Sequence, residues 1–266
     1  MPALSLHLLS LSTDVASFLQ ALRQTRKVIV ASRPRHVVIR SEVLDTNALT
    51  KTHWDLLVLL QPTGSNEPSI PESLTRSVKS EYKVAVGIPS KLLASYEARD
   101  KHLKATASSA SLTGSLETVR ANPSSQSLEV SPELLEFMDA LSGKHDGPVT
   151  MLNLLHFHHP DGKKSYYQYG QAFIPVAGKR GGNAKLVGNV VPPSNEVDSR
   201  GKADRPGEDW WNEISIVHYP SIRHFCDMLA GEDYQAINEK YRLSALRDTF
   251  LLCTTEFDVE RPGAKL

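Results

Sequence analysis

The sequence predicts an α+β protein built from two βαββαβ units in tandem, and three observations lead to that class. Residues 147–259 alternate strand-like and helix-like segments in this order, and residues 4–90 repeat the order with weaker patterns. An aromatic residue also precedes the apolar third strand of each half, at Trp54 and at Trp210. A single unit would leave one sheet face bare, so we expect the two sheets to pack against each other and enclose a pocket.

In the first half, residues 4–12 alternate leucine with polar residues as a strand does, and Asp14 is a suitable N-cap for the amphipathic helix that follows. Residues 28–40 are rich in β-branched residues but contain a proline, which predicts either two strand pieces or a bulged edge strand. The unit is completed by a strand, a helix with proline in its first turn and a last strand, at residues 54–61, 71–82 and 83–89.

Between the halves, residues 91–105 predict a helix outside the repeat, and the Ser-, Thr- and Ala-rich residues 105–130 predict a linker. Ser131 and Pro132 then give a start signal for one more short helix. We therefore expect an N-terminal unit, a linker and a C-terminal unit, at residues 1–104, 105–130 and 131–266.

The second half is patterned more clearly than the first. Its first strand, at residues 147–157, precedes a helix whose aromatic stripe runs through Tyr166, Tyr169 and Phe173 and which ends at a pair of glycines. Residues 192–209 are rich in Pro, Gly and charge and predict a loop. The remaining elements are two strands, a helical region interrupted at a glycine, and a last strand, at residues 184–191, 210–219, 221–248 and 250–259.

Composition narrows the functional classes. The chain has 266 residues, 40% of them hydrophobic, and its 30 basic and 30 acidic residues cancel, which argues against a nucleic-acid partner. The longest apolar run, residues 56–60, is far shorter than the roughly 20 residues that span a bilayer. The start lacks a basic leader, and two cysteines are too few for a disulfide framework. We expect a soluble, cytoplasmic protein, monomeric or homodimeric, whose partner is a small molecule and neither a nucleic acid nor a membrane.

Several spaced residues in the second half resemble the DUF1330 family of dimeric α/β-barrel proteins, which have the ferredoxin-like βαββαβ order. The matching features lie within residues 147–257: Asn153 in the first strand, Tyr166 and Tyr169 one turn apart in the first helix, the paired glycines after it, and a tryptophan before the third strand. In that superfamily two sheets usually pack face to face across a homodimer and enclose a pocket. The resemblance implies that this chain forms such a barrel internally, with its diverged N-terminal unit in the place of the partner subunit.

The resemblance implies a fold without choosing a reaction, because the superfamily includes cofactor-free monooxygenases, polyketide cyclases, isomerases, dehalogenases and haem-handling proteins. The sequence has no GxGxxG motif after a strand, no Walker loop, no GxSxG elbow and no HExxH motif, which disfavours a nucleotide enzyme. We therefore expect no bound cofactor and no metal site.

Three histidines, His156, His158 and His159, cluster where the strand at residues 147–157 ends. In a strand, His156 and His158 would share one face, where they could share a metal or act as a base pair. A polar strand end that leads into a turn is the alternative interpretation. No second group of ligands has metal-binding spacing, so we predict His158 as a proton carrier and His156 as a substrate-binding residue.

Two polar residues within apolar strands are stronger candidates. The side-chain amide of Asn153 lies in mid-strand and needs hydrogen-bond partners. It either anchors the neighbouring backbone or holds a substrate carbonyl inside the barrel. In the third strand, Ile214 and Ile216 predict the face that helices cover, which would turn Trp211 and Glu213 into the barrel. A carboxyl beside an indole in a partly dry cavity would have a raised pKa and could act as a general acid or base. A surface ion pair of Glu213 is the alternative.

Further candidates lie on the first helix of the second unit and in the first half. Tyr166 and Tyr169 are core residues in one interpretation, and pocket-wall hydroxyls that polarise a ketone or enolate oxygen in the other. His7 lies in mid-strand, and His36 and Arg40 share a strand face by parity. Each of these three could project across the interface between the halves.

These residues predict a cofactor-independent enzyme that performs acid–base chemistry, namely cyclisation, isomerisation or decarboxylation, on an aromatic or polyketide-like carbonyl compound. Glu213 or His158 would move the proton. Asn153 and Tyr169 would hold the oxygen, and Trp211 would pack on the substrate ring. The other substrate-binding candidates are Tyr166, His156, His36, His7 and Arg40. A cofactor-free monooxygenase in the same pocket and a non-catalytic ligand-binding or association module are the alternatives.

Overall fold

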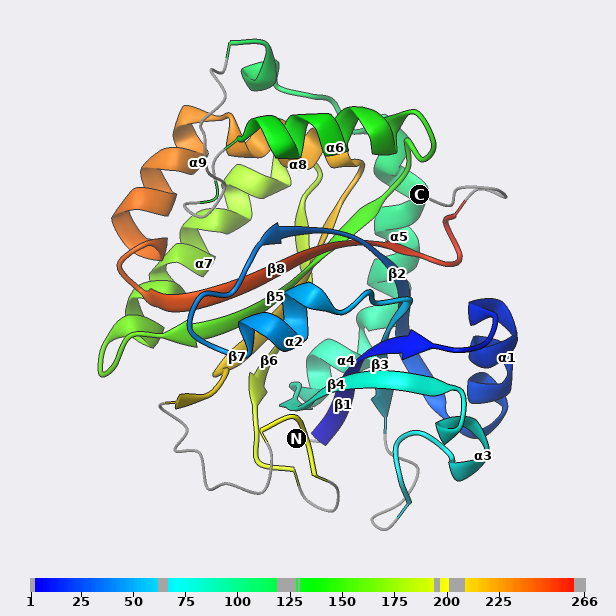
Figure 1. Cartoon of the computed structure of the whole chain (residues 1–266). Helices are drawn as coiled ribbons and strands as arrows, with labels where there is room; N and C mark the ends of the chain where they lie inside the picture. The colour runs from blue at the N-terminus through cyan, green and yellow to red at the C-terminus, as the bar shows by residue number, and fades with distance from the viewer. Residues whose placement is uncertain are drawn as a thin grey trace.

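The computed structural model describes residues 3–61, 67–118, 128, 130–193, 197–200 and 209–260. Eight antiparallel strands close into a barrel in the order β1-β3-β2-β8-β5-β7-β6-β4, and helices pack around it (Figure 1). The chain therefore has an α+β fold with a closed antiparallel barrel, which confirms the predicted fold class at this level.

The first half of the chain supplies four strands, β1 (Ala3–Leu11), β2 (Lys27–Ile39), β3 (Leu56–Gln61) and β4 (Val78–Gly87). Its helices are α1 (Val15–Thr25), α2 (Thr46–Lys51), α3 (Glu72–Thr75), α4 (Ser90–Ala94) and α5 (Tyr96–Thr106). Asp14 caps α1 as predicted, because its carboxylate accepts a hydrogen bond from the amide of Ser17 at 2.9 Å. The helix predicted at residues 71–82 is only the short α3, since the chain from Val78 onward pairs with β1.

The second half supplies strands β5 (Val149–Phe157), β6 (Asn183–Val190), β7 (Glu213–Tyr219) and β8 (Leu246–Glu256). Its helices are α6 (Pro132–Ser142), α7 (Gly162–Gly178), α8 (Ile222–Leu229), α9 (Glu232–Ile237) and the π-helical turn η4 (Asn238–Arg242). Ser131 caps α6 as predicted, because its hydroxyl oxygen accepts a hydrogen bond from the amide of Leu134 at 3.2 Å.

The two halves have the same strand order within the barrel. The first four strands lie in the order β4-β1-β3-β2 and the last four in the order β8-β5-β7-β6, so the fourth, first, third and second strands follow one another in each half. The halves meet at two seams, where β2 pairs with β8 and where β4 pairs with β6.

Strand β2 forms the longer seam. Its residues 27–32 pair with β3 of the first half and its residues 32–39 pair with β8 of the second half. Pro34 lies within this continuous strand, and the register shifts between Pro34 and His36. The bulge expected at this proline is therefore present, but β2 is a central strand of the closed barrel and not an edge.

The shorter seam joins β4 to β6 and depends on glycine. A Cβ atom on Gly188 of β6 would lie 2.6 Å from Cγ1 of Val86 and 3.0 Å from the carbonyl oxygen of Gly87, both on β4. A side chain of any size at Gly188 would force the two strands apart. The close approach that closes the barrel on this side therefore requires a residue without a Cβ atom.

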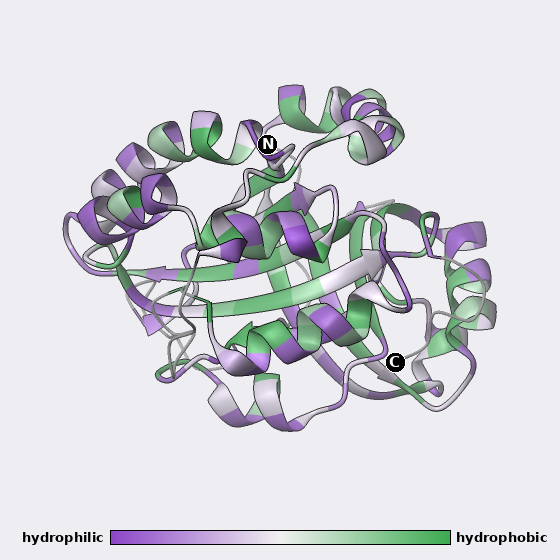
Figure 2. Ribbon diagram, turned by 90° about the horizontal axis from the view of Figure 1, so that it is seen from above, coloured by the Kyte–Doolittle hydropathy of each residue, from purple (hydrophilic) through white to green (hydrophobic). Residues whose placement is uncertain are grey.

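The interior of the barrel is filled by side chains from both halves. Leu6 and Val84 from the first half belong to the same buried cluster as Leu152, Ile216 and Leu252 from the second. Leu49 and Trp54 join this cluster at the end of the barrel near α2, and Tyr96 of α5 joins it at the other end. Green apolar residues run along the strands, while the helices mix green and purple (Figure 2). The barrel is a packed core, as in other barrels of this strand number.

Helices cover the outer faces of the sheet unequally. Helix α1 and its neighbour α3 pack on the first half, where Phe18 and Leu22 bury against Val58. The second half carries a thicker layer of α6, α7, α8 and α9, which lies over the outer faces of β5, β7 and β8 (Figure 1). A cavity in this helical layer would thus lie outside the barrel.

The predicted linker is partly described. Its two short 3₁₀ turns are η1 (Ala107–Ser109) and η2 (Ser115–Glu117), while residues 119–127 and 129 lie outside the described residues. Asp227 of α8 accepts hydrogen bonds from the amides of Thr113 at 2.8 Å and Leu116 at 3.2 Å, so this segment packs on the second half. The predicted domain boundaries stay predictions. Most of the loop expected at residues 192–209 also lies outside the described part of the chain.

Within the described ranges, no helix combines the length and the apolar character that crossing a membrane requires. The cytoplasmic location stays a prediction.

Candidate ligand site beneath helix α7

A cavity of about 430 Å³ lies between helix α7 and the outer face of the second half's sheet. Its floor comes from alternate residues of β5 and β7, its roof from α7, and one side from α9 and η4. The polar residues that line it are Asn153, Lys163, Tyr166, Tyr167, Tyr169, Gln171, Asn183, Glu213, Ser215, Tyr219, Tyr234 and Arg242. A volume of this size suits a small organic ligand.

The position of this cavity corrects the predicted geometry. The pocket was expected between two sheets, inside the barrel, with the face of Ile214 and Ile216 under helices. The structure reverses the two faces of β7: Ile214 and Ile216 lie in the barrel core, while Glu213 and Ser215 face α7. Both faces of a closed barrel strand are buried, so apolar content alone could not decide which face the helices cover.

Trp211 does not share the cavity with Glu213. Strand β7 begins only at Glu213, so the alternation expected from Trp210 onward does not apply to the two tryptophans, and both lie in the barrel core. The indole nitrogen of Trp211 donates a hydrogen bond to the hydroxyl of Tyr82 at 2.7 Å, and Tyr82 donates to Asp45 at 2.9 Å. Trp211 thus lies inside the barrel as predicted, but the predicted common face of Trp211 and Glu213 is wrong.

Helix α7 forms the roof because one of its faces is aromatic. Tyr166, Tyr169 and Phe173 follow one another along this face with ring centroids 5.2 and 5.7 Å apart. The helix ends before Gly181, whose φ of +72° lies in the left-handed region, where a Cβ atom would also clash with Pro220 at 2.5 Å. The predicted glycine stop is confirmed, and it turns the chain directly into β6, which forms another wall of the cavity.

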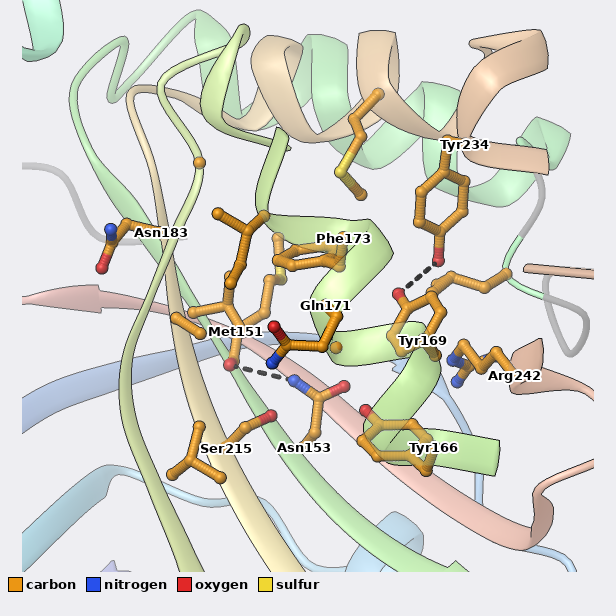
Figure 3. Close-up of a pocket in the computed structure, with 18 of the residues that line it drawn as sticks. Met151, Asn153, Tyr166, Tyr169, Gln171, Phe173, Asn183, Ser215, Tyr234 and Arg242 are labelled. Atoms are coloured by element: carbon orange, nitrogen blue, oxygen red, sulfur yellow. Dashed lines mark hydrogen bonds between the residues drawn. The ribbon is translucent and has the colours of Figure 1, made fainter. Parts of the chain in front are cut away.

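Asn153 and Ser215 form a polar strip on the otherwise apolar floor. They are cross-strand neighbours on β5 and β7, and both point from the sheet toward α7 (Figure 3). The amide nitrogen of Asn153 donates a hydrogen bond of 3.3 Å to the carbonyl oxygen of Met151. That amide group has a second proton, and its oxygen is directed to the side where Tyr166 lies (Figure 3). Asn153 thus anchors the backbone, which is one of the two predicted alternatives, and it faces a cavity outside the barrel and not inside it.

Glu213 is the acidic group of the cavity. Burial raises the pKa of its carboxyl group to about 7, against a smaller opposing effect of the Lys163 ammonium. Among the described residues, the carboxyl has no hydrogen-bond or ion-pair partner, because Lys163 instead donates to the side chain of Asn189 at 2.8 Å. The pKa of Glu213 is raised, as predicted. The cause is burial on the side of the sheet that faces α7, and the indole of Trp211 takes no part.

Three tyrosines surround the inner end of the cavity. The hydroxyls of Tyr169 and Tyr234 are hydrogen-bonded to each other at 3.2 Å. Burial raises the pKa of Tyr166 and of Tyr169, so both phenols keep their protons. Tyr166 has no hydrogen-bond partner among the described residues, and the charge of Glu213 contributes to its raised pKa, which places the two groups near each other. Tyr166 is therefore better placed than Tyr169 to donate a proton to a ligand oxygen.

The structure separates the histidine cluster. Strand β5 ends at Phe157, so His156 still points into the barrel, where it is fully buried, while His158 is exposed in the turn that follows. Neither ring lines the cavity. The expected common face of His156 and His158 is thus lost where the strand ends.

The candidates from the first half lie elsewhere. His36 and Arg40 do lie together, as their parity predicted, but their common contact is Glu133 of α6, at 3.7 and 3.1 Å. His7 is buried on the outer face of β1, where its Nδ1 lies 2.7 Å from Glu81. None of these three residues lines the cavity beneath α7.

Arg242 is the functional candidate that sequence reasoning missed. It ends the π-helical turn η4, is only 3% exposed, and lines the cavity opposite the sheet. In the sequence it is one arginine in a predicted helix, and charged helical residues are usually exposed. The sequence contains only a weak indication of its role. Arg242 lies in the turn that follows α9, and Tyr234 of α9 is buried in the helical layer around the cavity.

Comparisons with known proteins give distant likenesses only. No protein-family model matches the chain, and no curated protein matches it. A "putative monooxygenase" from Lactobacillus acidophilus is 8% identical, with 96% of this chain and 93% of that chain covered at a TM-score of 0.48. An "anthrone oxidase-like protein" is 11% identical, with 100% and 97% covered at a TM-score of 0.35. A protein of unknown function from Rhodopseudomonas palustris is 26% identical, with 47% and 93% covered at a TM-score of 0.36. The TM-scores are all below 0.5, and neither a family nor an activity follows from these likenesses.

Proposed function

We propose that the cavity beneath α7 binds a small carbonyl compound and that Glu213 moves a proton to or from it. The observation that carries this proposal is the carboxyl of Glu213, which lines a cavity of about 430 Å³, has no partner among the described residues, and has its pKa raised by burial to about 7. A carboxyl with this pKa is present in both protonation states near neutral pH, which suits a general acid and base. The apolar walls suit an aromatic or polyketide-like ligand.

The proton transfer that these residues support is enolisation. The Glu213 carboxylate accepts a proton from the carbon next to the ligand carbonyl, the C–H electron pair forms a C=C bond, and the carbonyl oxygen takes the negative charge. The hydroxyl of Tyr166 and the amide of Asn153 then donate hydrogen bonds to that oxygen. Return of the proton from Glu213 to another carbon gives an isomer, and attack of the enolate on a second carbonyl gives a ring. In this proposal Tyr166 takes the role that the sequence suggested for Tyr169.

Exchange of protons for deuterons in a carbonyl probe tests this step without knowledge of the natural substrate. We expect the protein to accelerate α-proton exchange of 2-tetralone in D₂O, measured by NMR. Glu213→Gln should slow this exchange about a hundredfold, since positioned general bases contribute on that scale. Glu136→Gln, which changes an exposed glutamate of α6, is the matched control and should leave the rate unchanged.

Two results would count against the enzyme. Exchange that is equally fast in the Glu213→Gln variant would remove Glu213 as the base. Binding of 2-tetralone without any acceleration of exchange would favour the alternative, a non-catalytic ligand-binding module in the same cavity.

We further propose that the chain is a tandem of two ferredoxin-like units and a diverged relative of the DUF1330 family. The support for the tandem is the common strand order of the two halves and the βαββαβ succession of the second. The support for the family is the set of spaced residues in the second half, of which Asn153, Tyr166, Tyr169 and Gly182 line the cavity.

A further inference from the structure

Arg242 is a buried cation that has no counter-charge among the described residues. Its side chain is 3% exposed, and its Nη2 atom has no hydrogen-bond acceptor. Within the described part of the chain, no carboxylate oxygen lies within the 4.0 Å of its guanidinium that defines an ion pair. Burial of a guanidinium is costly unless its charge is paired and its donors are hydrogen-bonded. The protein thus keeps a buried cation whose partner is not supplied by the described residues.

A carboxylate that shares a second cavity with Arg242 is already hydrogen-bonded elsewhere. Asp248 lines a small second cavity of about 120 Å³ to which Arg242 also contributes. Its carboxylate, however, accepts hydrogen bonds from the backbone amides of Glu42, Val43 and Leu44, at 3.0, 3.0 and 2.7 Å. With the amide of Thr249 at 2.9 Å, four backbone donors satisfy this carboxylate without the guanidinium. Asp248 therefore does not explain why Arg242 is buried.

The other side of the guanidinium faces the ligand cavity. Arg242 extends from η4 toward Tyr166 and Tyr169, which lie between it and the floor of the cavity (Figure 3). Its charge acts on the phenols of Tyr166, Tyr169 and Tyr234, opposing the rise in their pKa values, so it lies near all three hydroxyls. The π-helical turn that carries Arg242 is a rare form that is frequent at functional sites. An anionic group placed here would meet a cation and phenol donors together.

We propose that the ligand of this cavity is an apolar, aromatic carboxylic acid whose carboxylate binds Arg242. The guanidinium offers a planar pair of N–H donors that matches a carboxylate, while Phe173, Met151 and Val217 provide apolar walls for the ring. The inference rests on the proposed function for the position of the ligand and names its substrate class. A ligand of this class would bind Arg242 through its carboxylate at one end and would place a separate carbonyl group near Glu213.

The test measures binding of a matched pair of probes by titration calorimetry at pH 6. Sodium 2-naphthoate is the anion, and 2-naphthamide is its neutral counterpart of the same shape. We expect the wild-type protein to prefer 2-naphthoate. Arg242→Gln should weaken binding of 2-naphthoate by about tenfold to a hundredfold, because hydrogen bonds to charged groups are strong, and leave 2-naphthamide within about twofold. Arg223→Gln removes an exposed arginine of α8 and should change neither affinity.

Several results would overturn the inference. One is equal affinity of the wild-type protein for both probes, which needs no variant and so does not depend on whether Arg242→Gln folds. Another is an equal loss of affinity for both probes in Arg242→Gln, which would show that Arg242 has a structural role. A neutral probe that binds while the anion does not would overturn this inference and leave the proposed function standing. Conversely, binding of 2-naphthoate with no Glu213-dependent exchange would refute the acid–base proposal and retain the anion site.

Discussion

At the scale of single residues, the candidate site is a small set of polar groups without partners in an apolar cavity. Glu213 and Tyr166 have no hydrogen-bond partners among the described residues, and the Nη2 atom of Arg242 has none. A buried polar group without a hydrogen bond lowers stability by about 1–3 kcal/mol. Glu213, Tyr166 and Arg242 line the same cavity, so one ligand would give all three a partner, and this is the residue-level argument for a ligand.

Glu213 also gives a prediction about stability and pH. Its pKa is about 7 in the folded protein against 4.5 ordinarily, so between these values the folded state holds a proton that the unfolded chain has lost. The stability of the wild-type protein therefore falls as pH rises through this window, and the full cost of burying the carboxylate applies above about pH 7. Glu213→Gln removes that cost, so at pH 8 the variant should be more stable by roughly 1–3 kcal/mol.

Urea denaturation at pH 8 and pH 4.5 measures this difference. At pH 4.5 the wild-type and Glu213→Gln proteins should have nearly equal free energies of unfolding, since the wild-type carboxyl is then protonated when folded. A Glu213→Gln variant that is less stable at pH 8 would show that the carboxylate has a stabilising partner and would contradict the free carboxyl described here.

The identity of the cavity-lining residues was more predictable than the side of the sheet on which their side chains lie. Asn153, Glu213 and Tyr166 stand out in the sequence because each is polar within an apolar pattern, and all three line the cavity. The face of β7 was mispredicted because Ile214 and the outward-facing Val217 are equally apolar. Arg242 gave no pattern, since the missing counter-charge that makes it unusual is a property of three-dimensional contacts.

At the scale of elements, local signals were reliable where one residue decides the backbone. The caps at Asp14 and Ser131 and the glycine stop at Gly181 were predicted and are present. Ser221 occupies the N-cap position of α8, but its hydroxyl bonds to His224 at 2.8 Å and does not cap the helix. Such signals depend on neighbours in sequence, which explains their success.

Elements that depend on distant partners were less predictable. Helix α2 was not expected, because the six residues of α2 are held by packing of Leu49 into the barrel core and not by a strong pattern of their own. The predicted helix at residues 71–82 lost its second half to β4, whose pairing with β1 runs from Val78 to Gly87. In both cases tertiary contacts outweigh local propensity.

At the scale of the whole molecule, helix α5 joins the two halves at one end of the barrel through a buried ionic cluster. Lys185 of β6 is fully buried and pairs with Asp100 of α5 and Glu256 of β8. Lys104 of α5 also binds Glu256, at 2.5 Å, and Asp258, at 2.7 Å. The three carboxylates lie close enough to one another to hold a metal ion, but the two ammonium groups already pair with all three and balance two of the three charges.

Removal of one partner from this cluster should destabilise the whole barrel. Lys185→Met would leave Asp100 and Glu256 with less than their full counter-charge, and breaking a buried pair in this way costs about 3–5 kcal/mol. Urea denaturation measures the loss, with Lys101→Met on the exposed side of α5 as the control. Equal stability of Lys185→Met and the wild-type protein would show that the cluster does not join the halves.

The unequal helical layers of the two halves explain why the cavity beneath α7 lies in the second half. The outer sheet of the first half is covered by the short layer of α1 and α3, whereas that of the second half lies under four helices with aromatic faces. The barrel core is filled, so the space for a ligand arises in the thicker layer. This asymmetry was not predictable from the sequence order, which is the same in both halves.

A crystal structure of the protein with 2-naphthoate would test the location of the site most directly. We predict density for the probe between α7 and the outer face of β5 and β7, with its carboxylate on Arg242 and its ring against Phe173. Density inside the barrel, among the side chains around Leu152 and Leu252, would contradict a site beneath α7.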